Sequence, residues 1–392
     1  MPERVVIVSA ARTPLGGLLG DLAGLPAWEL GAAAIAAAVQ RAGVPRDSID
    51  EVLMGNCLMA GQGQAPARQA ARRAGLPDAT GAVTLSKVCG AGMRAAMFAH
   101  DMLLAGSADV LVAGGMESMS NAPHLAHIRK GVKAGSTSLL DHMAYDGLED
   151  AYEPGKPMGL FGEECALRYG FSREAMDRFA IASVERSQRA NEDGSFEWEI
   201  APVPLKGGAG SVLMSRDERP FKLKVDKIPS LKPAFREDGR ITAASSSSNA
   251  DGAAALVLMR ESDAQRQSLA PLARIVAHSV HAQEPRWFTT APIGAIHKLL
   301  DRAGWSSGEV DLWEVNEAFA AVPMAVMHEF KLGIEQMNVH GGACALGHPI
   351  GASGARIVVT LLGALRQRGL KRGVASLCIG GGEATAMALE LL

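Results

Sequence analysis

Short apolar runs alternate with longer amphipathic segments along the first third of the chain. Aliphatic and β-branched runs predict strands over residues 4–9, 51–56 and 109–115. Segments rich in leucine and alanine predict helices over 28–41 and from Cys89 to about residue 105. Strands that alternate with helices in this way favour a layered α/β fold with a largely parallel sheet.

The last third of the chain repeats this order of elements. Strands predicted over 272–278, 311–316 and 373–382 alternate with helices over 292–303 and 351–368. In both series, a predicted strand closes on a pair of glycines. We therefore expect the chain to contain two related α/β halves.

The stretch between the two series has a different texture. Over 120–244 the strand pattern fades, and charged segments with Gly and Pro surround one strong helix over 173–191, which Ser172 is placed to cap. A buried strand over 253–259 follows. We interpret the stretch as an insertion that covers a site between the halves. The predicted units are an N-terminal half (1–119 and 245–270), an inserted loop domain (120–244) and a C-terminal half (271–392).

Composition excludes several classes of protein. Of the 392 residues, 48% are hydrophobic and 21% are charged, which excludes global disorder. The formal net charge of −3 gives no overall attraction to nucleic acid or to a membrane surface. We also expect neither a membrane span nor a signal peptide, because the apolar runs fall short of the roughly 20 residues a span needs. Five scattered cysteines are too few for a disulfide framework and predict reduced thiols in a cytoplasmic protein.

Three segments place a reactive side chain among glycines. Cys89 stands at the mouth of a predicted helix, where backbone amides and the helix dipole favour the thiolate. Cys89 could equally be a small buried residue that fits a tight turn and has no catalytic role. His348 precedes a proline in a glycine-dense segment, which suits a positioned general base. Cys378 lies at the carboxyl edge of a strand, where α/β sheets place ligands, although a core cysteine is the alternative.

With these three residues as its centre, the chain resembles the thiolase family over its full length, and within it the acetyl-CoA acetyltransferase type. The resemblance rests on nine motifs, in order and at family spacing: AARTP (10–14), VCGAGM (88–93), GGMESM (114–119), DERP (217–220), LKPAF (231–235), NADGAA (249–254), NEAF (316–319), GHPIGASG (347–354) and CIGGG (378–382). It implies αβαβα layers formed by the duplicated halves.

The resemblance also implies a role for each reactive residue. Cys89 would attack an acyl-CoA thioester and carry the acyl group, with His348 as the base that accepts its proton. Cys378 would remove a proton from the methyl carbon of a second acetyl-CoA. Asn316, through a water, and the backbone amide of Gly380 would help to hold the oxyanions. The implied reaction is reversible Claisen condensation of two acetyl-CoA to acetoacetyl-CoA, with coenzyme A as substrate and product and no metal or redox cofactor.

Coenzyme A would need an apolar tunnel for its pantetheine arm and cations for its phosphates. The family's pantetheine positions carry over to Leu148, Met158, Ala234, Phe235, Ala243, Ser247, Ala318, Phe319 and Ile350. Five basic residues are candidates for the phosphates, although each is nearly as well explained as a solvated surface residue: Arg216, Arg219, Lys222, Lys224 and Lys227. A homotetramer, with contacts near residues 124–135, is also implied only by the resemblance.

The sequence departs from the biosynthetic family pattern away from the catalytic residues. Departures occur at Pro157, Phe221, Asn249, Phe288 and Glu383. They leave open a 3-ketoacyl-CoA thiolase of broader or longer chain specificity in fatty-acid β-oxidation.

More distant alternatives fit the sequence less well. The second cysteine argues against a 3-ketoacyl synthase, and the absence of G-x-G-x-x-G after the first strand argues against a nucleotide-binding oxidoreductase. A relative that only binds coenzyme A would not need all of the catalytic residues, and this chain retains them: Cys89, Asn316, His348 and Cys378. The pairs His124/His127 and His278/His281 have zinc-like spacing but no third ligand in register, so a structural role is favoured.

Overall fold

The structure, a computed structural model, describes residues 3–205 and 212–392. The N-terminal half contributes five strands to one sheet in the order β1–β10–β5–β3–β4. β10 pairs antiparallel with both of its neighbours, whereas β3 pairs parallel with β5 and β4. The strand bounds are β1 (Val5–Arg12), β3 (Glu51–Gly55), β4 (Gly81–Leu85), β5 (Val110–Ser118) and β10 (Ala250–Arg260).

The C-terminal half repeats this arrangement in the order β11–β14–β13–β12. β14 is antiparallel to β11 and β13, and β12 is parallel to β13, as β3 is to β5. A short antiparallel contact between β1 and β11 joins the two sheets into one. The strand bounds are β11 (Ala273–Ala282), β12 (Leu312–Val315), β13 (Arg372–Ile379) and β14 (Glu383–Leu391). The matching order and direction of strands confirm the predicted duplication.

The expectation of a largely parallel sheet is wrong. Among the described residues, three of the eight neighbouring pairs along the main sheet are parallel. The reason lies in the connections. β13 turns directly into β14 through three glycines, two of which, Gly381 and Gly382, have φ of 91° and 93°. This left-handed conformation is cheap only for glycine, and it reverses the chain within three residues.

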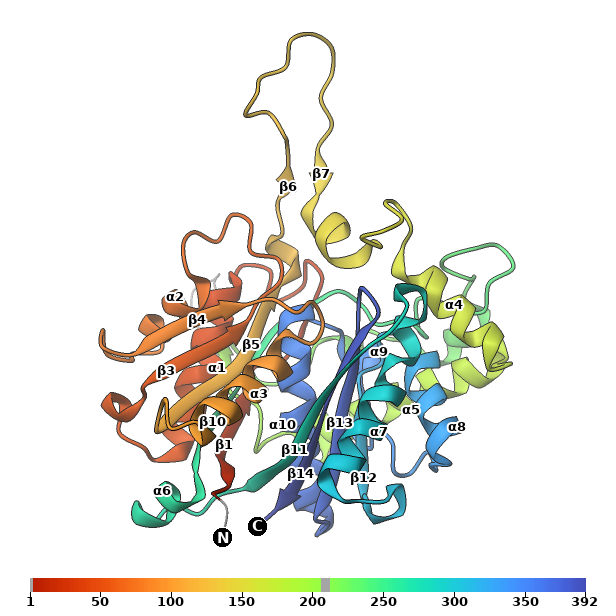
Figure 1. Cartoon of the computed structure of the whole chain (residues 1–392). Helices are drawn as coiled ribbons and strands as arrows, with labels where there is room; N and C mark the ends of the chain where they lie inside the picture. Colours follow the sequence, from red (N-terminus) through yellow and green to blue (C-terminus); the bar gives the residue numbers. More distant parts are fainter. Residues whose placement is uncertain (1–2, 206–211) are drawn as a thin grey trace.

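Helices separate and flank the sheets as αβαβα layers, as expected (Figure 1). α1 packs on β1 and β10, α7 packs on β11 and β14, and α3 and α10 pack against each other between the two sheets. α10 is buried from Ile350 to Leu365 on every side, because its residues there are apolar or small apart from Arg356, which pairs with the buried Glu314 at 2.9 Å. The helix bounds are α1 (Ala27–Ala42), α2 (Pro66–Arg73), α3 (Ala91–Leu104), α6 (Glu261–Arg266), α7 (Ala291–Ala303), α8 (Ala321–Phe330), α9 (Ala343–Leu346) and α10 (Ile350–Arg368).

The segment between β5 and β10 forms the upper part of the view in Figure 1 and includes a long projecting hairpin. The predicted helix over 173–191 is confirmed as α5, and the Ser172 hydroxyl caps it by accepting from the Ala175 amide at 3.2 Å. None of the described helices is long and apolar enough to cross a membrane. Besides short 3₁₀ turns, the remaining described elements are β2 (Gly16–Gly17), β6 (His124–Leu125), β7 (Leu140–Asp141), a π-helical turn (Ala144–Leu148), α4 (Met158–Arg168), α5 (Arg173–Glu192), β8 (Val203–Pro204) and β9 (Leu213–Met214).

A fully buried arginine ties the inserted segment to the sheet. Arg12, at the end of β1, bonds to Glu199 through Nε and to both carboxylate oxygens of Asp217, at 2.7 and 3.0 Å. All three side chains are inaccessible to solvent. Two of the family-like motifs, AARTP and DERP, therefore meet in one ion network whose removal would leave charges buried without partners.

Candidate active site

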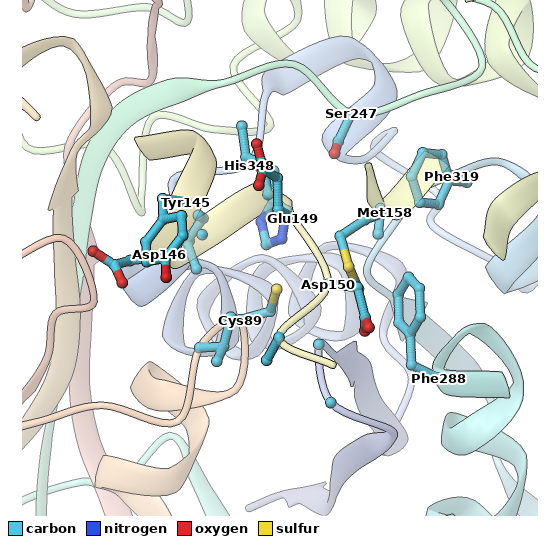
Figure 2. A pocket seen from close by; sticks show the side chains of 18 of the residues that line it. Cys89, Tyr145, Asp146, Glu149, Asp150, Met158, Ser247, Phe288, Phe319 and His348 are labelled. Atoms are coloured by element: carbon cyan, nitrogen blue, oxygen red, sulfur yellow. The ribbon is translucent and has the colours of Figure 1, made fainter. Parts of the chain in front are cut away.

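A cavity of about 350 Å³ opens where the N-terminus of α3, the N-terminus of α10 and the end of β13 meet. Cys89 and His348 both line it, and their sulfur and imidazole face the same space (Figure 2). Gly380 and Gly381, in the turn after β13, line the same cavity. Residues 145–152 of the inserted segment close its other side. The two halves and the insertion thus each contribute to one pocket.

Cys89 lies two residues before α3, after a strained turn. Val88 has φ of 46°, a left-handed value that side chains other than glycine rarely adopt, and this turn presents the cysteine to the cavity. The amides of Gly380 and of Cys89 itself hydrogen-bond to the sulfur. Burial nevertheless raises the pKa of the Cys89 thiol to about 11, because desolvation outweighs these two bonds. The backbone amides lower the pKa of Cys89, as the helix N-terminus predicts, but burial raises it further, so the residue needs a base.

His348 is oriented as that base. Its Nδ1 lies 2.5 Å from the Ser353 hydroxyl, which itself lies 2.9 Å from the carbonyl of Pro349. Because the hydroxyl donates its one proton to that carbonyl, it must accept from Nδ1–H. The tautomer is thereby fixed with a lone pair on Nε2, and Nε2 is buried without a protein partner. Burial, aided by the charge of Arg356, lowers the pKa of His348 to about 3, so the ring is neutral near pH 7.

Cys378 and Asn316 do not line the cavity, although Gly380 and Ala318, two residues after them, do. Cys378, near the end of β13, is fully buried, and burial raises the pKa of its thiol well above the ordinary value. The charge of a Cys89 thiolate raises it further, so the two sulfurs interact. Asn316 follows β12, and both of its side-chain amide atoms are buried without a protein partner. A buried amide in that state calls for a water or a ligand.

The residues expected to contact pantetheine fall into two groups. Six line the cavity: Leu148, Met158, Ser247, Ala318, Phe319 and Ile350. Phe235 is outside the lining and packs edge-on against Phe319, with ring centroids 5.9 Å apart. The backbone amide of Ala234 donates a hydrogen bond to the carbonyl of Ile241 and so holds the neighbouring turn. Ala243 lines a second cavity nearby.

That second cavity, of about 360 Å³, gathers four of the five candidate cations: Arg219, Lys222, Lys224 and Lys227. Ser248 borders it, next to Ser247 of the first cavity. Arg216 is apart from this group, with its guanidinium over the Phe221 ring. Lys222, which lines this cavity, also forms an ion pair with Glu218. A recess that carries four cations among apolar side chains therefore lies close to the first cavity.

The structure also shows what stands at the departures from the family pattern. Phe288 lines the cavity and packs edge-on against Phe161, with centroids 6.0 Å apart. Pro157 is the N-cap residue of α4, which begins at Met158. Asn249 lies beside Met143, with Nδ2 3.4 Å from Sδ. Glu383 pairs with Lys87. Of these, Phe288 is the departure that shapes the cavity itself.

Sequence reasoning missed two groups of residues. Tyr145, Asp146 and Tyr152 line the cavity from the inserted segment, where no periodic pattern marks them. Glu117, inside the GGMESM motif, is fully buried and accepts bonds from three backbone amides, among them Gly351 at 2.8 Å. Burial raises the pKa of Glu117 to about 7, although those hydrogen bonds lower it. A charged residue in an otherwise apolar strand was the signal for this structural carboxylate.

Comparison with known proteins agrees with this arrangement. Residues 5–262 match the family described as thiolase, N-terminal domain, and residues 269–391 match thiolase, C-terminal domain. Acetyl-CoA acetyltransferase 2 of Arabidopsis thaliana is 49% identical over 100% of this chain and 98% of its own length. The chain belongs to the thiolase family.

Solved structures give the same result. The crystal structure of the Bacillus anthracis acetyl-CoA acetyltransferase matches with a TM-score of 0.96 and 40% identity, and covers 100% of this chain and 99% of its own. The Acat5 thiolase from Ascaris suum, solved in complex with coenzyme A, matches with a TM-score of 0.93 and 40% identity over 99% and 100% of the two chains. The fold of the two halves is therefore that of a thiolase.

Proposed function

We propose that this chain is an acetyl-CoA C-acetyltransferase, which condenses two acetyl-CoA to acetoacetyl-CoA and coenzyme A and cleaves acetoacetyl-CoA in reverse. The observation that carries the proposal is the pairing of Cys89 with the neutral, unpartnered Nε2 of His348 in one cavity. Relatives named acetyl-CoA acetyltransferase, at 45–49% identity over nearly the full chain, support the acetyl substrate.

The first half-reaction follows from the protonation states. Nε2 of His348 takes the proton of the Cys89 thiol, and the thiolate attacks the thioester carbonyl. The amides of Cys89 and Gly380, which already point at the sulfur, are placed to hold the oxygen that becomes negative. The bond to the coenzyme A sulfur then breaks, and that sulfur leaves with the proton of the Cys378 thiol, which becomes a thiolate, while His348 keeps the proton it took from Cys89. The acetyl group stays on Cys89.

The second half-reaction needs a stronger base next to the acyl group. Cys378, as a thiolate, takes a proton from the methyl group of a second acetyl-CoA, and its raised pKa makes that thiolate more basic. Asn316, through a water on its unpartnered amide, and His348 would hold the enolate oxygen. The carbanion attacks acetyl-Cys89, the carbon–sulfur bond breaks, and the departing sulfur recovers its proton from His348, while Cys378 keeps the methyl proton as a thiol. Product and free enzyme result.

Coenzyme A would lie across both cavities. The apolar lining around Met158 and Phe319 suits the pantetheine arm, and Ser247 offers one hydroxyl to its amides. The four cations of the second cavity are suited to the phosphates. In this proposal the reaction uses no metal or redox cofactor, because each proton and acyl transfer has a protein group to perform it.

A thiolysis series tests the acyl specificity. The proposal predicts that kcat/KM is highest for acetoacetyl-CoA and falls as the 3-ketoacyl chain lengthens, because the Phe288 ring, backed by Phe161, occupies the cavity lining. A chain that cleaves only long 3-ketoacyl-CoA substrates would instead be the thiolase of broader β-oxidation specificity. Absence of thiolysis with any of them would overturn the assignment of function.

We further propose a cytoplasmic homotetramer. The hairpin formed by β6 and β7 projects from the body and exposes apolar side chains, including Ile128 at 54%, Val132 at 49% and Leu139 at 64% (Figure 1). Exposed apolar groups on a projecting arm are typical of subunit contacts. One relative, from Gibberella zeae, is named as cytosolic.

A further inference from the structure

Three side chains from the two halves meet beside α3, far from the catalytic cavity. His100 and Asp101 lie on the third turn of α3, and His278 lies in the middle of β11. Nδ1 of His100 is 3.0 Å and Nε2 of His278 is 2.8 Å from the same oxygen, Oδ1 of Asp101. The two imidazole rings meet edge to face with centroids 4.9 Å apart. Among the described residues, this is the group of His, Cys, Asp and Glu side chains whose ligand atoms all lie within 4.8 Å of one another.

We propose that His100, Asp101 and His278 form a binding site for a divalent transition-metal ion, with Zn²⁺ as the expected occupant. Two imidazole nitrogens and one carboxylate oxygen are the ligand set that zinc takes when a fourth, open position is left to water. Calcium and magnesium prefer all-oxygen sites, so they fit this set poorly.

The spacing of the three atoms is close to what such an ion needs. With bonds of roughly 2.0–2.1 Å, tetrahedral ligand atoms lie roughly 3.3 Å apart. The two contacts at Asp101 therefore need to open by a few tenths of an ångström. The imidazoles are 13% and 14% exposed, whereas the carboxylate is 53% exposed, which leaves one side of the site open to solvent.

The elements that carry the ligands are rigid. The backbone of His278 pairs with Met387 of β14, and its carbonyl accepts a bond of 2.7 Å from the guanidinium of Arg302. α3 is held on its other face by β5 and α10. Sites on buried strands and helices keep their geometry better than sites on loops. No third ligand for His278 could be recognised near it in the sequence, because both partners come from the other half of the chain.

An ion here would connect the two halves without entering the chemistry. Asp101 follows Cys89 by twelve residues, which corresponds to roughly 18 Å along a helix at 1.5 Å per residue. The ion would join the helix that begins at the nucleophile to the first strand of the C-terminal half. Binding is therefore expected to raise the melting temperature of the protein and to leave its turnover unchanged.

A titration of the metal-free full-length chain with Co²⁺ tests the site, because tetrahedral cobalt absorbs visibly. We expect visible bands that saturate at one ion per chain, with no sulfur-to-cobalt charge-transfer band, and a Zn²⁺-dependent rise in melting temperature. Asp101→Asn and His278→Gln should abolish the bands. His297→Gln, which changes a histidine with a 56% exposed side chain, should keep them.

Three results would overturn the proposal. These are no cobalt bands with the native chain, bands that persist in both ligand variants, or a charge-transfer band that places the ion on a cysteine. Because the half-exposed Asp101 can become asparagine without emptying the core, a loss of binding in that variant is separable from unfolding. Thiolase activity is measured on the same samples, so failure of the metal site and failure of the catalytic proposal are distinguishable.

Discussion

Replacement of Ser353 by alanine tests how much the orientation of His348 contributes to activity, while the imidazole itself is retained. The serine hydroxyl accepts from Nδ1 of His348 and so holds the tautomer with a lone pair on Nε2, in the cavity that Cys89 also lines. In Ser353→Ala, a buried N–H is left without an acceptor, at a cost of about 1–3 kcal/mol. The ring also becomes free to move its proton to Nε2, where it can no longer accept one from the thiol.

Since each 1.36 kcal/mol is a factor of ten in rate, this cost corresponds to a loss in kcat/KM of about 5- to 150-fold. The assay is thiolysis of acetoacetyl-CoA, followed by loss of substrate absorbance, with the melting temperature measured in parallel. Ser279→Ala is the matched control, because the hydroxyl of Ser279 is equally buried and donates to the carbonyl of Ala295 at 2.6 Å, away from the cavity. If Ser353→Ala loses no more activity than Ser279→Ala, the orientation argument is refuted.

Three further predictions concern the buried network, the thiol and the hairpin. Arg12→Met leaves two buried carboxylates unpaired and should lower the free energy of unfolding by about 3–5 kcal/mol in urea denaturation, whereas Arg4→Met, at an exposed pair, should change it by less than about 1 kcal/mol. Equal effects would contradict the burial argument. Alkylation of Cys89 by iodoacetamide in the free enzyme should still be accelerating with pH above 9, because burial raises the pKa of this thiol to about 11; a plateau near pH 7 would refute it. Val132→Glu should reduce a tetramer to dimers in light scattering, because it places a charge on the exposed hairpin; an unchanged mass would remove the hairpin from the contact.

Local features of the fold were predictable from local sequence. The α5 helix was predicted over 173–191, and the structure ends it one residue later. The prediction was possible because the cap at Ser172 and the apolar face of the helix are determined by residues close in sequence. Strand direction was not predictable in the same way. β10 pairs with β1 only after more than 200 intervening residues, and nothing within the strand itself records which way it will run.

The same distinction holds for the site. The positions of Cys89 and His348 beside glycines and helix ends were readable, and the structure places them in one cavity. The protonation state of Cys89 could not be predicted, because the desolvation of its thiol depends on residues 145–152 and other distant segments that enclose it. The carboxylate partner of His278 was hidden for the same reason, since Asp101 is 177 residues away.

The division of labour between the two sulfurs is the central claim, and trapping of the acyl-enzyme tests it most directly. Cys378→Ala is incubated with acetyl-CoA alone, and the intact protein and its peptides are examined by mass spectrometry. The account predicts that Cys89 carries one acetyl group while acetoacetyl-CoA fails to form. An unmodified Cys89 in this variant, or condensation that continues without Cys378, would contradict it.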